Sequence, residues 1–435
     1  MEPQRTLTSA MQAILQKARD AGVVGAVSGV PTYRRLLASA ELIVANGVSA
    51  EPLVRTDAHL VASHAREVVV GLKHAMQATH ARRGLVALKR SDRMAVMAMS
   101  RAIEEDGFAK FHIELKALDP FFPADDLPVL LHLLGNPSGA LVFNVHTLYH
   151  LAEAQRGQSM TMRLVTITGQ VQTPKTLWAP LGTPLSALVE AAGGPVFDET
   201  PWLLLGGPLR GRVQADLEGV LRPELGTIAV LPGEHNLVRH RHAPLNRELR
   251  RAQSVCNQCA RCTEICPSVQ RGSALRPHKI MRSLHLEMDS QVPLFESALD
   301  CTACNLCTFY ACREALSPGR IIAEIRDRQM KSGLEAPPAW LAGKVEGVPL
   351  GRLVKRLGLS GLDHLAPWDP KPFHAKKIEL LLSATQQPTV RPGDYVSFGQ
   401  IVARPIQEDE GVPLHASLAG VVKSLDEAIV IEETI

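Results

Sequence analysis

All eight cysteines of the chain lie between residues 256 and 312, in two groups of four. The first group is Cys256, Cys259, Cys262 and Cys266, spaced C-x2-C-x2-C-x3-C and followed by Pro267. The second group is Cys301, Cys304, Cys307 and Cys312, with one more residue before its last cysteine. This spacing is typical of bacterial ferredoxins, in which it holds iron–sulfur clusters. The sequence therefore predicts a domain with two [4Fe–4S] clusters that passes one electron at a time.

The fourth cysteine of each group is predicted to act with the opposite group. Intervals of two residues in a tight loop let three thiolates converge on one cubane, whereas the fourth cysteine lies beyond that loop. In two-cluster ferredoxins it ligates the other cluster. One cluster is therefore expected on Cys256, Cys259, Cys262 and Cys312, and the other on Cys301, Cys304, Cys307 and Cys266.

Disulfides and structural zinc are the alternatives to clusters. Cysteines two residues apart rarely reach disulfide geometry, and a reducing compartment disfavours the bond. Zinc takes four thiolates, usually from two C-x-x-C pairs separated by a loop. A third cysteine at the same spacing fits that pattern poorly, so two clusters remain the favoured interpretation.

Composition excludes several other classes of protein. The 435 residues are 46% hydrophobic and 21% charged with a net charge of +3, which is ordinary for a globular protein of several domains and indicates no nucleic-acid partner. No run reaches the roughly 20 apolar residues of a membrane span. The first residues also lack the basic end and apolar core of a signal peptide. We therefore expect a cytoplasmic protein without a membrane span.

The first 160 residues have the pattern of an α/β domain. An amphipathic helix is predicted over 7–20, followed by a loop of small and apolar residues at 23–32. A buried strand at 42–47 then alternates with helices predicted at 57–80 and 92–105.

The remaining segments predict smaller units. A strand at 164–169, a helix after Pro184 and a strand at 203–205 indicate a small α+β unit. The proline-rich stretch 336–375 is predicted to be a linker with one or two short helices. Short strands separated by turns after residue 376 predict a compact β-barrel.

A basic stretch precedes the first cysteine group. It contains Arg239, Arg241, Arg247, Arg250 and Arg251. A solvated helix face would explain these arginines. Alternatively, they could dock an acidic electron carrier or an anionic cofactor.

Five further features resemble one family in the same order along the chain. They are V-V-G-A-V-S-G-V-P-T at 23–32, Asn46-Gly47 with Glu51-Pro52, P-A-D-D at 123–126, N-V-H-T-L at 144–148, and the region 164–232 with L-G-T-P-L and G-G-P. The family is the cobalamin reductases of propanediol-utilisation microcompartments, relatives of the C subunit of Rnf complexes and the flavin subunit of respiratory complex I. The Rnf subunit carries its barrel at the N-terminus, whereas the barrel here is C-terminal, as in the cobalamin reductases.

The resemblance implies an α/β multidomain fold class. Its parts are a Rossmann-like flavodehydrogenase domain over 1–160, a β-grasp soluble-ligand-binding module over 161–235, a helical dicluster ferredoxin domain over 236–335, the linker over 336–375, and a barrel-sandwich domain over 376–435. The barrel is similar to lipoyl-type sandwiches but has no lysine at the expected hairpin tip, so a structural role is predicted for it.

The resemblance also implies a reaction. In this family a hydride passes from NADH to FMN, and single electrons pass through the clusters to cob(II)alamin. FMN and NADH are then expected near Gly25, Gly29, Asn46, Glu51 and Asp126. The implied partners are electron donor and acceptor proteins, including a cobalamin adenosyltransferase, and the implied location is a bacterial microcompartment in the cytoplasm.

The glycine loop leaves two other functions open. Val27 and Ser28 stand where the family has glycines, and a side chain there prevents the close approach of a ligand to the backbone. The alternatives are an electron carrier without flavin and a scaffold subunit of a larger redox complex.

Overall fold

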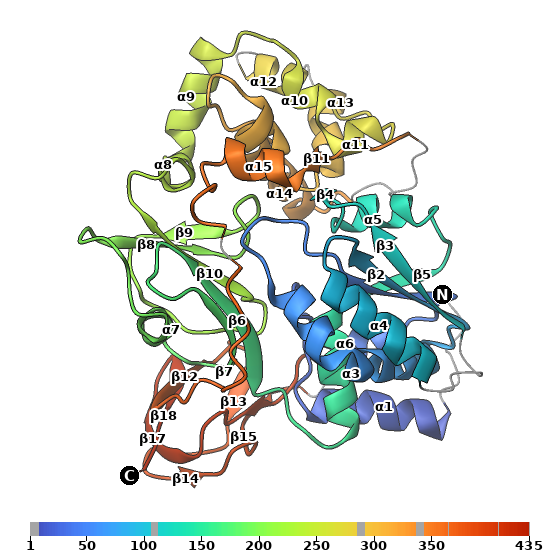
Figure 1. Cartoon of the computed structure of the whole chain (residues 1–435), viewed down its shortest axis with the longest axis vertical. Helices are drawn as coiled ribbons and strands as arrows, with labels where there is room; N and C mark the ends of the chain where they lie inside the picture. The colour runs from blue at the N-terminus through green and yellow to red at the C-terminus, as the bar shows by residue number, and fades with distance from the viewer. Residues whose placement is uncertain are drawn as a thin grey trace.

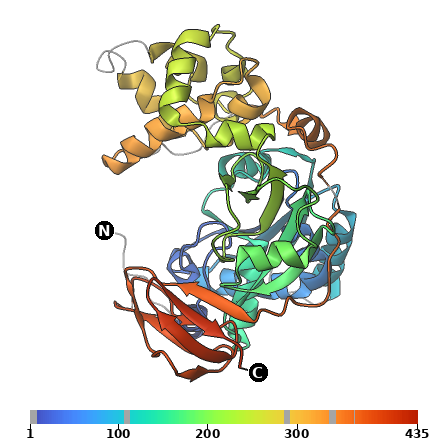
Figure 2. The same cartoon turned by 90° about the vertical axis from the view of Figure 1, so that its left-hand side faces the viewer.

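The computed structural model describes residues 8–105, 112–284, 292–335, 343–363, 365–407 and 409–434. The helical unit that carries the cysteines lies at one end of the long axis, and the C-terminal strands lie at the other (Figures 1 and 2). The N-terminal α/β unit and a mixed sheet lie between these ends. None of the helices in the described ranges has the length and hydropathy that crossing a membrane requires.

A four-stranded parallel sheet organises the N-terminal unit, with the strand order β3-β2-β1-β5. The strands are β1 (Leu42–Gly47), β2 (Arg83–Lys89), β3 (His112–Leu118) and β5 (Ala140–Asn144). The helices are α1 (Ser9–Asp20), α2 (Thr32–Leu36), α3 (Thr56–Thr79), α4 (Arg93–Glu105), α5 (Leu127–Leu133) and α6 (Val145–Gln155). The central strand β1 is apolar and buried, as is typical of a parallel sheet covered on both faces. All four strands end at one edge of the sheet, where open α/β sheets bind their ligands.

A five-stranded mixed sheet follows, in the order β7-β6-β10-β8-β9. Its elements are β6 (Met162–Gly169), β7 (Lys175–Pro180), α7 (Leu185–Ala191), β8 (Pro201–Leu205), β9 (Arg212–Gln214) and β10 (Thr227–Pro232). The strands β6 and β10 are parallel and the other pairs are antiparallel. The strands and helix predicted in this region are therefore present.

The cysteine-bearing unit consists of short helices around two small apolar cores. Its elements are α8 (Asn236–His242), α9 (Leu245–Val255), α10 (Arg261–Glu264), α11 (Pro267–Gln270), α12 (Pro277–Ser283), α13 (Val292–Glu296), η2 (Ser297–Asp300), η3 (Cys307–Ala311) and α14 (Pro318–Lys331). Helix α14 starts at a proline, which is favourable at the first helical position. Its Ile321 packs in one core and its Ile322 in the other, so this helix joins the two halves of the unit.

The segment predicted as a linker is packed in its described parts. We name residues 343–363 and 365–375 the strap; residues 336–342 and 364 of the predicted linker lie outside the described residues. The strap contains β11 (Val348–Pro349), which pairs with β4 (Phe121–Phe122), and the helix α15 (Leu350–Arg356). Leu353, Leu357 and Leu359 are buried against the N-terminal unit. The segment contains a short helix, as predicted, and its leucines form an apolar face that packs against the neighbouring units.

Two small antiparallel sheets end the chain, in the orders β12-β18-β17-β14 and β13-β15-β16. Their strands are β12 (Lys377–Leu381), β13 (Gln386–Pro388), β14 (Tyr395–Val396), β15 (Ile401–Pro405), β16 (Leu414–His415), β17 (Gly420–Leu425) and β18 (Ala428–Glu432). This terminal unit buries Met160 and Leu181 in its core. The Tyr33 hydroxyl donates to the backbone oxygen of Asp409 at 2.9 Å. The unit is therefore seated against both the N-terminal unit and the mixed sheet.

The strap gives the first testable prediction. Leu353 is completely buried, and Leu353→Ala is expected to lower the free energy of unfolding by about 2–5 kcal/mol because it leaves a cavity in the shared core. Thermal denaturation should show a lower midpoint. The matched control is Leu365→Ala on the same strap, where the side chain is 83% exposed. Equal midpoints for the two variants would contradict the packed strap.

Candidate functional site

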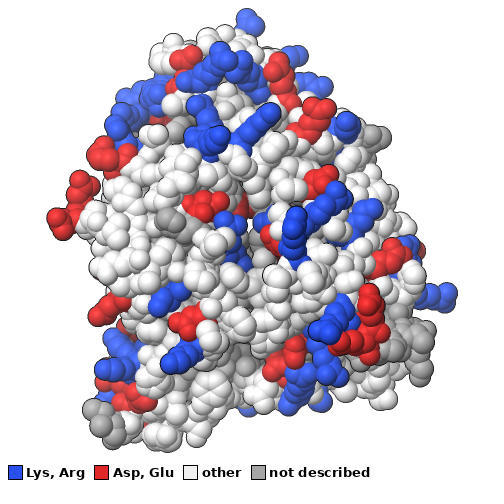
Figure 3. Space-filling model, viewed as in Figure 1, with Lys and Arg blue, Asp and Glu red and all other residues white. Residues whose placement is uncertain are grey.

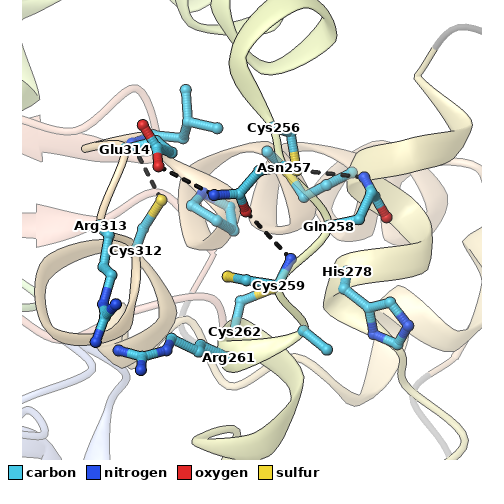
Figure 4. Close-up of a pocket in the computed structure, with 14 residues that line it drawn as sticks. Cys256, Asn257, Gln258, Cys259, Arg261, Cys262, His278, Cys312, Arg313 and Glu314 are labelled. Carbon is cyan, nitrogen blue, oxygen red and sulfur yellow. Dashed lines mark hydrogen bonds between the residues drawn. The ribbon is translucent and has the colours of Figure 1, made fainter.

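Four cysteines from two distant segments surround one cavity. They are Cys256, Cys259, Cys262 and Cys312, which we name the outer set because Cys259 is exposed (Figure 4). The other four cysteines line a second cavity. They are Cys266, Cys301, Cys304 and Cys307, and we name them the inner set because Cys304 and Cys307 are buried. Each set takes its fourth cysteine from the opposite sequence group, as the spacing led us to expect; that these thiols ligate clusters remains a prediction.

The two cysteine loops have the same backbone geometry. Gln258 and Ala260 in the first loop have φ of 58° and 59°, and Ala303 and Asn305 at the matching positions have φ of 55° and 60°. Residues other than glycine seldom adopt this region, and they persist there where the surroundings fix them, often at functional sites. The repeated turn lets three cysteines in each loop face one space.

Donors to sulfur are present in both sets. The amide of Ala303 lies 3.4 Å from the Cys301 Sγ, and the amide of Leu316 lies 3.3 Å from the Cys312 Sγ. The side-chain amide of Gln258 donates to the Cys256 Sγ at 3.3 Å. Hydrogen bonds to cysteine sulfur stabilise negative charge on a cluster and contribute to its reduction potential.

The thiols also resist ionisation without a metal. Burial, followed by the other three thiols of the outer set, raises the pKa of Cys262 to about 12. Burial also raises the pKa of Cys301 to about 11, although the hydrogen bond from the Ala303 amide opposes this shift. Iron would offset this cost because it binds the thiolate form. Each of the two cavities is lined by four cysteines, the number of ligands that a [4Fe–4S] cluster takes.

The inner set lies against the N-terminal unit. Cys304 packs in the same apolar core as Phe122 and Leu130. The Asn305 side-chain amide donates to the backbone oxygen of Leu209 at 2.9 Å. Burial and then neighbouring thiols, with Cys262 of the outer set among them, raise the pKa of Cys307 well above its usual value. The inner set is therefore adjacent both to the N-terminal unit and to the outer set.

Three of the predicted flavin residues lie at the carboxyl edge of the parallel sheet. Asn46 lies at the end of β1, and its side-chain amide donates to the backbone oxygen of Asp125 at 3.2 Å. The loop that contains Gly25 and Gly29 is joined to the start of α6, because the Ala26 amide donates to the Thr147 hydroxyl at 3.0 Å. These two contacts join four sequence motifs in pairs: the Asn46 motif with residues 123–126, and residues 23–32 with residues 144–148.

The other two predicted flavin residues, Glu51 and Asp126, contact the mixed sheet and the inner cysteine loop. Glu51 is buried and accepts hydrogen bonds from the amides of Leu209 and Arg210 at 2.7 and 3.3 Å. Burial raises the pKa of the Glu51 carboxyl, which the Arg210 guanidinium opposes. Burial also raises the pKa of Asp126, and the Arg210 guanidinium and a hydrogen bond with Thr302, next to Cys301, oppose it. The two carboxyl groups therefore link the N-terminal unit to the mixed sheet and to the inner set.

Sequence reasoning missed several polar residues at this edge. Lys89 is buried at the end of β2, and its Nζ donates to the Ser49 backbone oxygen at 2.9 Å. Asn144 donates to the Asp57 carboxylate at 3.3 Å. The signal for Asn144 and Thr147 was present, since both belong to the N-V-H-T-L segment. Lys89 could have been found as a lysine that ends an otherwise apolar strand.

The glycine loop uses its amides internally. The Gly25 amide donates to the Val30 oxygen and the Gly29 amide donates to the Gly25 oxygen, both at 2.8 Å. The Ser28 hydroxyl fills the space above Gly25, where an added Cβ would meet its Oγ. A phosphate bound at this loop must therefore replace these hydrogen bonds.

Three family models match separate parts of the chain. A Nuo51 FMN-binding domain matches residues 18–153, an SLBB domain matches 164–212, and a 4Fe–4S dicluster domain matches 255–317. The last match contains all eight cysteines, and the first contains the glycine loop and the parallel sheet.

Two curated relatives match almost the whole chain. The cobalamin reductase PduS of Citrobacter freundii is 32% identical over 98% of this chain and 97% of the relative. The chain belongs to the cobalamin reductase PduS family. PduS of Salmonella typhimurium is 33% identical over 95% of both chains. A more distant relative, the C component of the Na⁺-translocating ferredoxin:NAD⁺ oxidoreductase complex of Acetobacterium woodii, is 28% identical over 59% of this chain and 58% of its own length.

Membership of the PduS family and the domain matches agree with the geometry. They identify an oxidoreductase with a flavin and iron–sulfur role in electron transfer. The predicted resemblance to this family is confirmed, and so are the expected cofactor classes, FMN and [4Fe–4S] clusters.

Paired cysteine variants test which thiols share a cluster. The double variant Cys266→Ser/Cys304→Ser changes two residues of the inner set, so iron should fall from about eight atoms per chain to about four. Cys266→Ser/Cys259→Ser changes one residue in each set and should lose nearly all iron. Thr302→Ser, which keeps a hydroxyl beside Asp126, serves as the control. Equal iron content in the two double variants would contradict the crossed grouping.

Restoring glycines tests the loop. Val27→Gly/Ser28→Gly removes the side chain that fills the space above Gly25 and lets a ligand approach the backbone. We expect FMN to bind about tenfold more tightly, which corresponds to about 1.4 kcal/mol. Quenching of FMN fluorescence during titration measures this affinity, and Val196→Gly at another exposed valine is the control. An unchanged affinity would show that these side chains do not restrict the flavin.

Proposed function

We propose that the protein is an NADH-dependent cobalamin reductase in which electrons leave the N-terminal unit through the inner cysteine set and then the outer set. One observation supports this order: the apolar core that contains Phe122 and Leu130 also contains Cys304. Cys259 of the outer set is exposed instead. The inner set thus lies between the parallel sheet and the outer set.

The residues expected to hold the cofactors follow from the geometry. The outer set and the inner set would each hold one [4Fe–4S] cluster. The carboxyl edge of the parallel sheet, with Asn46, Lys89 and Thr147, would hold FMN. When bound, FMN would turn the two electrons of a hydride from NADH into single electrons, which the clusters can relay.

Charged residues of the chain hold this arrangement together. Arg210 forms ion pairs with Asp125 at 2.8 Å and with Glu51 at 3.5 Å. Its guanidinium also lies 4.7 Å from the centroid of the Phe122 ring, within the range of a cation–π interaction. Arg210 therefore fixes the turn of the mixed sheet against both the flavin edge and the apolar core beside the inner set.

The finer assignments of the fold are part of the proposal. The parallel sheet would be the Rossmann-like flavodehydrogenase domain, the mixed sheet a β-grasp module, and the terminal unit a barrel-sandwich with a structural role. Contacts of the terminal unit on two neighbouring units support that role. The family also suggests a cobalamin adenosyltransferase as partner and a microcompartment in the cytoplasm as location.

A comparison of two acceptors tests the function. Anaerobically purified protein should contain about one FMN and about eight iron atoms. It should reduce cob(II)alamin with NADH. Cys304→Ser is expected to reduce cob(II)alamin at least tenfold more slowly, because the inner set lies on the route. Its NADH oxidation with ferricyanide, which can react with the flavin directly, should remain within about twofold; Thr302→Ser is again the control.

Two outcomes would contradict the proposal. Iron and sulfide without flavin, together with no NADH oxidation, would leave an electron carrier instead of a reductase. Unchanged cob(II)alamin reduction in a Cys304→Ser protein that has lost a cluster would remove the inner set from the route.

A further inference from the structure

A third cavity shares Cys312 in its lining with the outer-set cavity. Its volume is about 530 Å³, and it lies between α8, α9, η3 and α15. Four arginines line it, namely Arg239, Arg247, Arg251 and Arg356. Glu248 is the one acidic side chain among the described lining residues. A lining with this excess of positive charge attracts anionic groups.

The single glutamate does not neutralise this lining. Glu248 is only 2% exposed and is already engaged by the Ser317 hydroxyl at 2.8 Å and by Arg251 at 3.3 Å. Arg239 forms an ion pair with Glu234 at 3.3 Å, whereas Arg247 and Arg356 form no ion pair with a carboxylate of the described chain. The positive charge of the cavity is therefore available to a partner.

The positive charge extends beyond the cavity. Figure 3 shows Lys and Arg side chains gathered over α9 and α15 in the upper part of the molecule. We name this surface the basic face and define it by Arg239, Arg247, Arg250, Arg251, Lys355 and Arg356. Because these residues come from the three helices α8, α9 and α15, they cover more area than one small anion can contact. This spread favours a protein surface that carries several carboxylates.

The basic face is connected directly to the backbone around Cys312. Arg356 donates to the Cys312 backbone oxygen at 3.2 Å. Arg251 donates to the backbone oxygens of Glu314 and Ala315 at 3.3 and 3.2 Å. A partner bound to these arginines would therefore lie close to the outer set. A solvated helix face alone does not explain why arginines from two elements converge on this cysteine.

We propose that the basic face docks an acidic electron-transfer protein, which exchanges electrons with the outer set. Transient redox complexes bury little surface and depend on complementary charge, which gives fast and salt-sensitive association. Each exchange would move one electron between the partner and the [4Fe–4S] cluster that the outer set would hold, so that one is oxidised as the other is reduced. The inference rests on the proposed function, because the outer set must carry electrons.

Charge reversal tests the basic face. The probe is an acidic bacterial ferredoxin, reduced with dithionite and mixed with the oxidised holoprotein in a stopped-flow instrument. Arg247→Glu/Arg250→Glu is expected to lower the second-order rate constant about tenfold at low ionic strength. Added NaCl should slow the unaltered protein and affect the variant little. The matched control is Arg391→Glu/Arg404→Glu, which makes the same change in net charge on the exposed surface of the terminal unit.

Cross-linking locates the contact independently. A carbodiimide should join the exposed Lys355 amine to a ferredoxin carboxylate, and Lys355→Arg should remove that cross-link because a guanidinium does not react. Equal rate losses in the two double variants, or a cross-link that survives Lys355→Arg, would overturn the proposal. Ferricyanide reduction by the reduced protein is the small-anion control. If Arg247→Glu/Arg250→Glu slowed the reaction with ferricyanide as much as the reaction with ferredoxin, the basic face would be assigned to small anions instead.

Failure of the docking proposal can be separated from failure of the proposed function. Iron content and dithionite reduction of both clusters are measured first on the same samples. A protein that loads and reduces its clusters, yet shows no effect of charge reversal, would lose only the docking surface. A protein without reducible clusters would contradict the proposed function itself.

Discussion

The arrangement of this protein depends on one apolar core that crosses the boundaries between its units. Residues of the parallel sheet, the mixed sheet, the strap and the inner cysteine loop are buried together in it. Burial of apolar surface is the main favourable term in folding and has no preferred direction, so polar contacts must set the orientation of the units. The Arg210 network and the Asn305 hydrogen bond do so at this core. The position of the inner set beside the parallel sheet thus depends on the packing of this core.

The two cysteine sets also differ in their electrostatic surroundings. The inner set is enclosed by apolar side chains and has the Asp126 carboxyl as well as the Arg271 and Arg326 guanidinium groups nearby, whereas the outer set is closer to solvent. Low dielectric opposes additional negative charge on a cluster. The difference in exposure would therefore favour a higher reduction potential for a cluster held by the outer set.

The sequence predicted the parts of this structure that depend on local pattern. The strand at 42–47, the helix after Pro184 and the crossed cysteine grouping follow from periodicity, helix-start residues and spacing, all of which involve neighbours in the chain. Long-range packing was not predictable in this way. The strap was predicted to be a linker because its prolines can be read from the sequence, whereas the residues that its leucines contact cannot. The contacts of Glu51 with Leu209 and of Asp126 with Thr302 were not predictable either, since they depend on how whole units meet; the role of both carboxyl groups at the flavin stays a prediction.

The packing of the terminal unit against its neighbours bears on the order in which the domains of such a protein can be connected. The unit contacts Tyr33, near the first helix, as well as Met160 and Leu181 at the mixed sheet. Non-covalent contacts at its surface hold this unit in place. The same contacts can form whether the unit is joined to the N-terminus or to the C-terminus of the remaining chain. The packing of this unit therefore does not fix which end of a chain carries it.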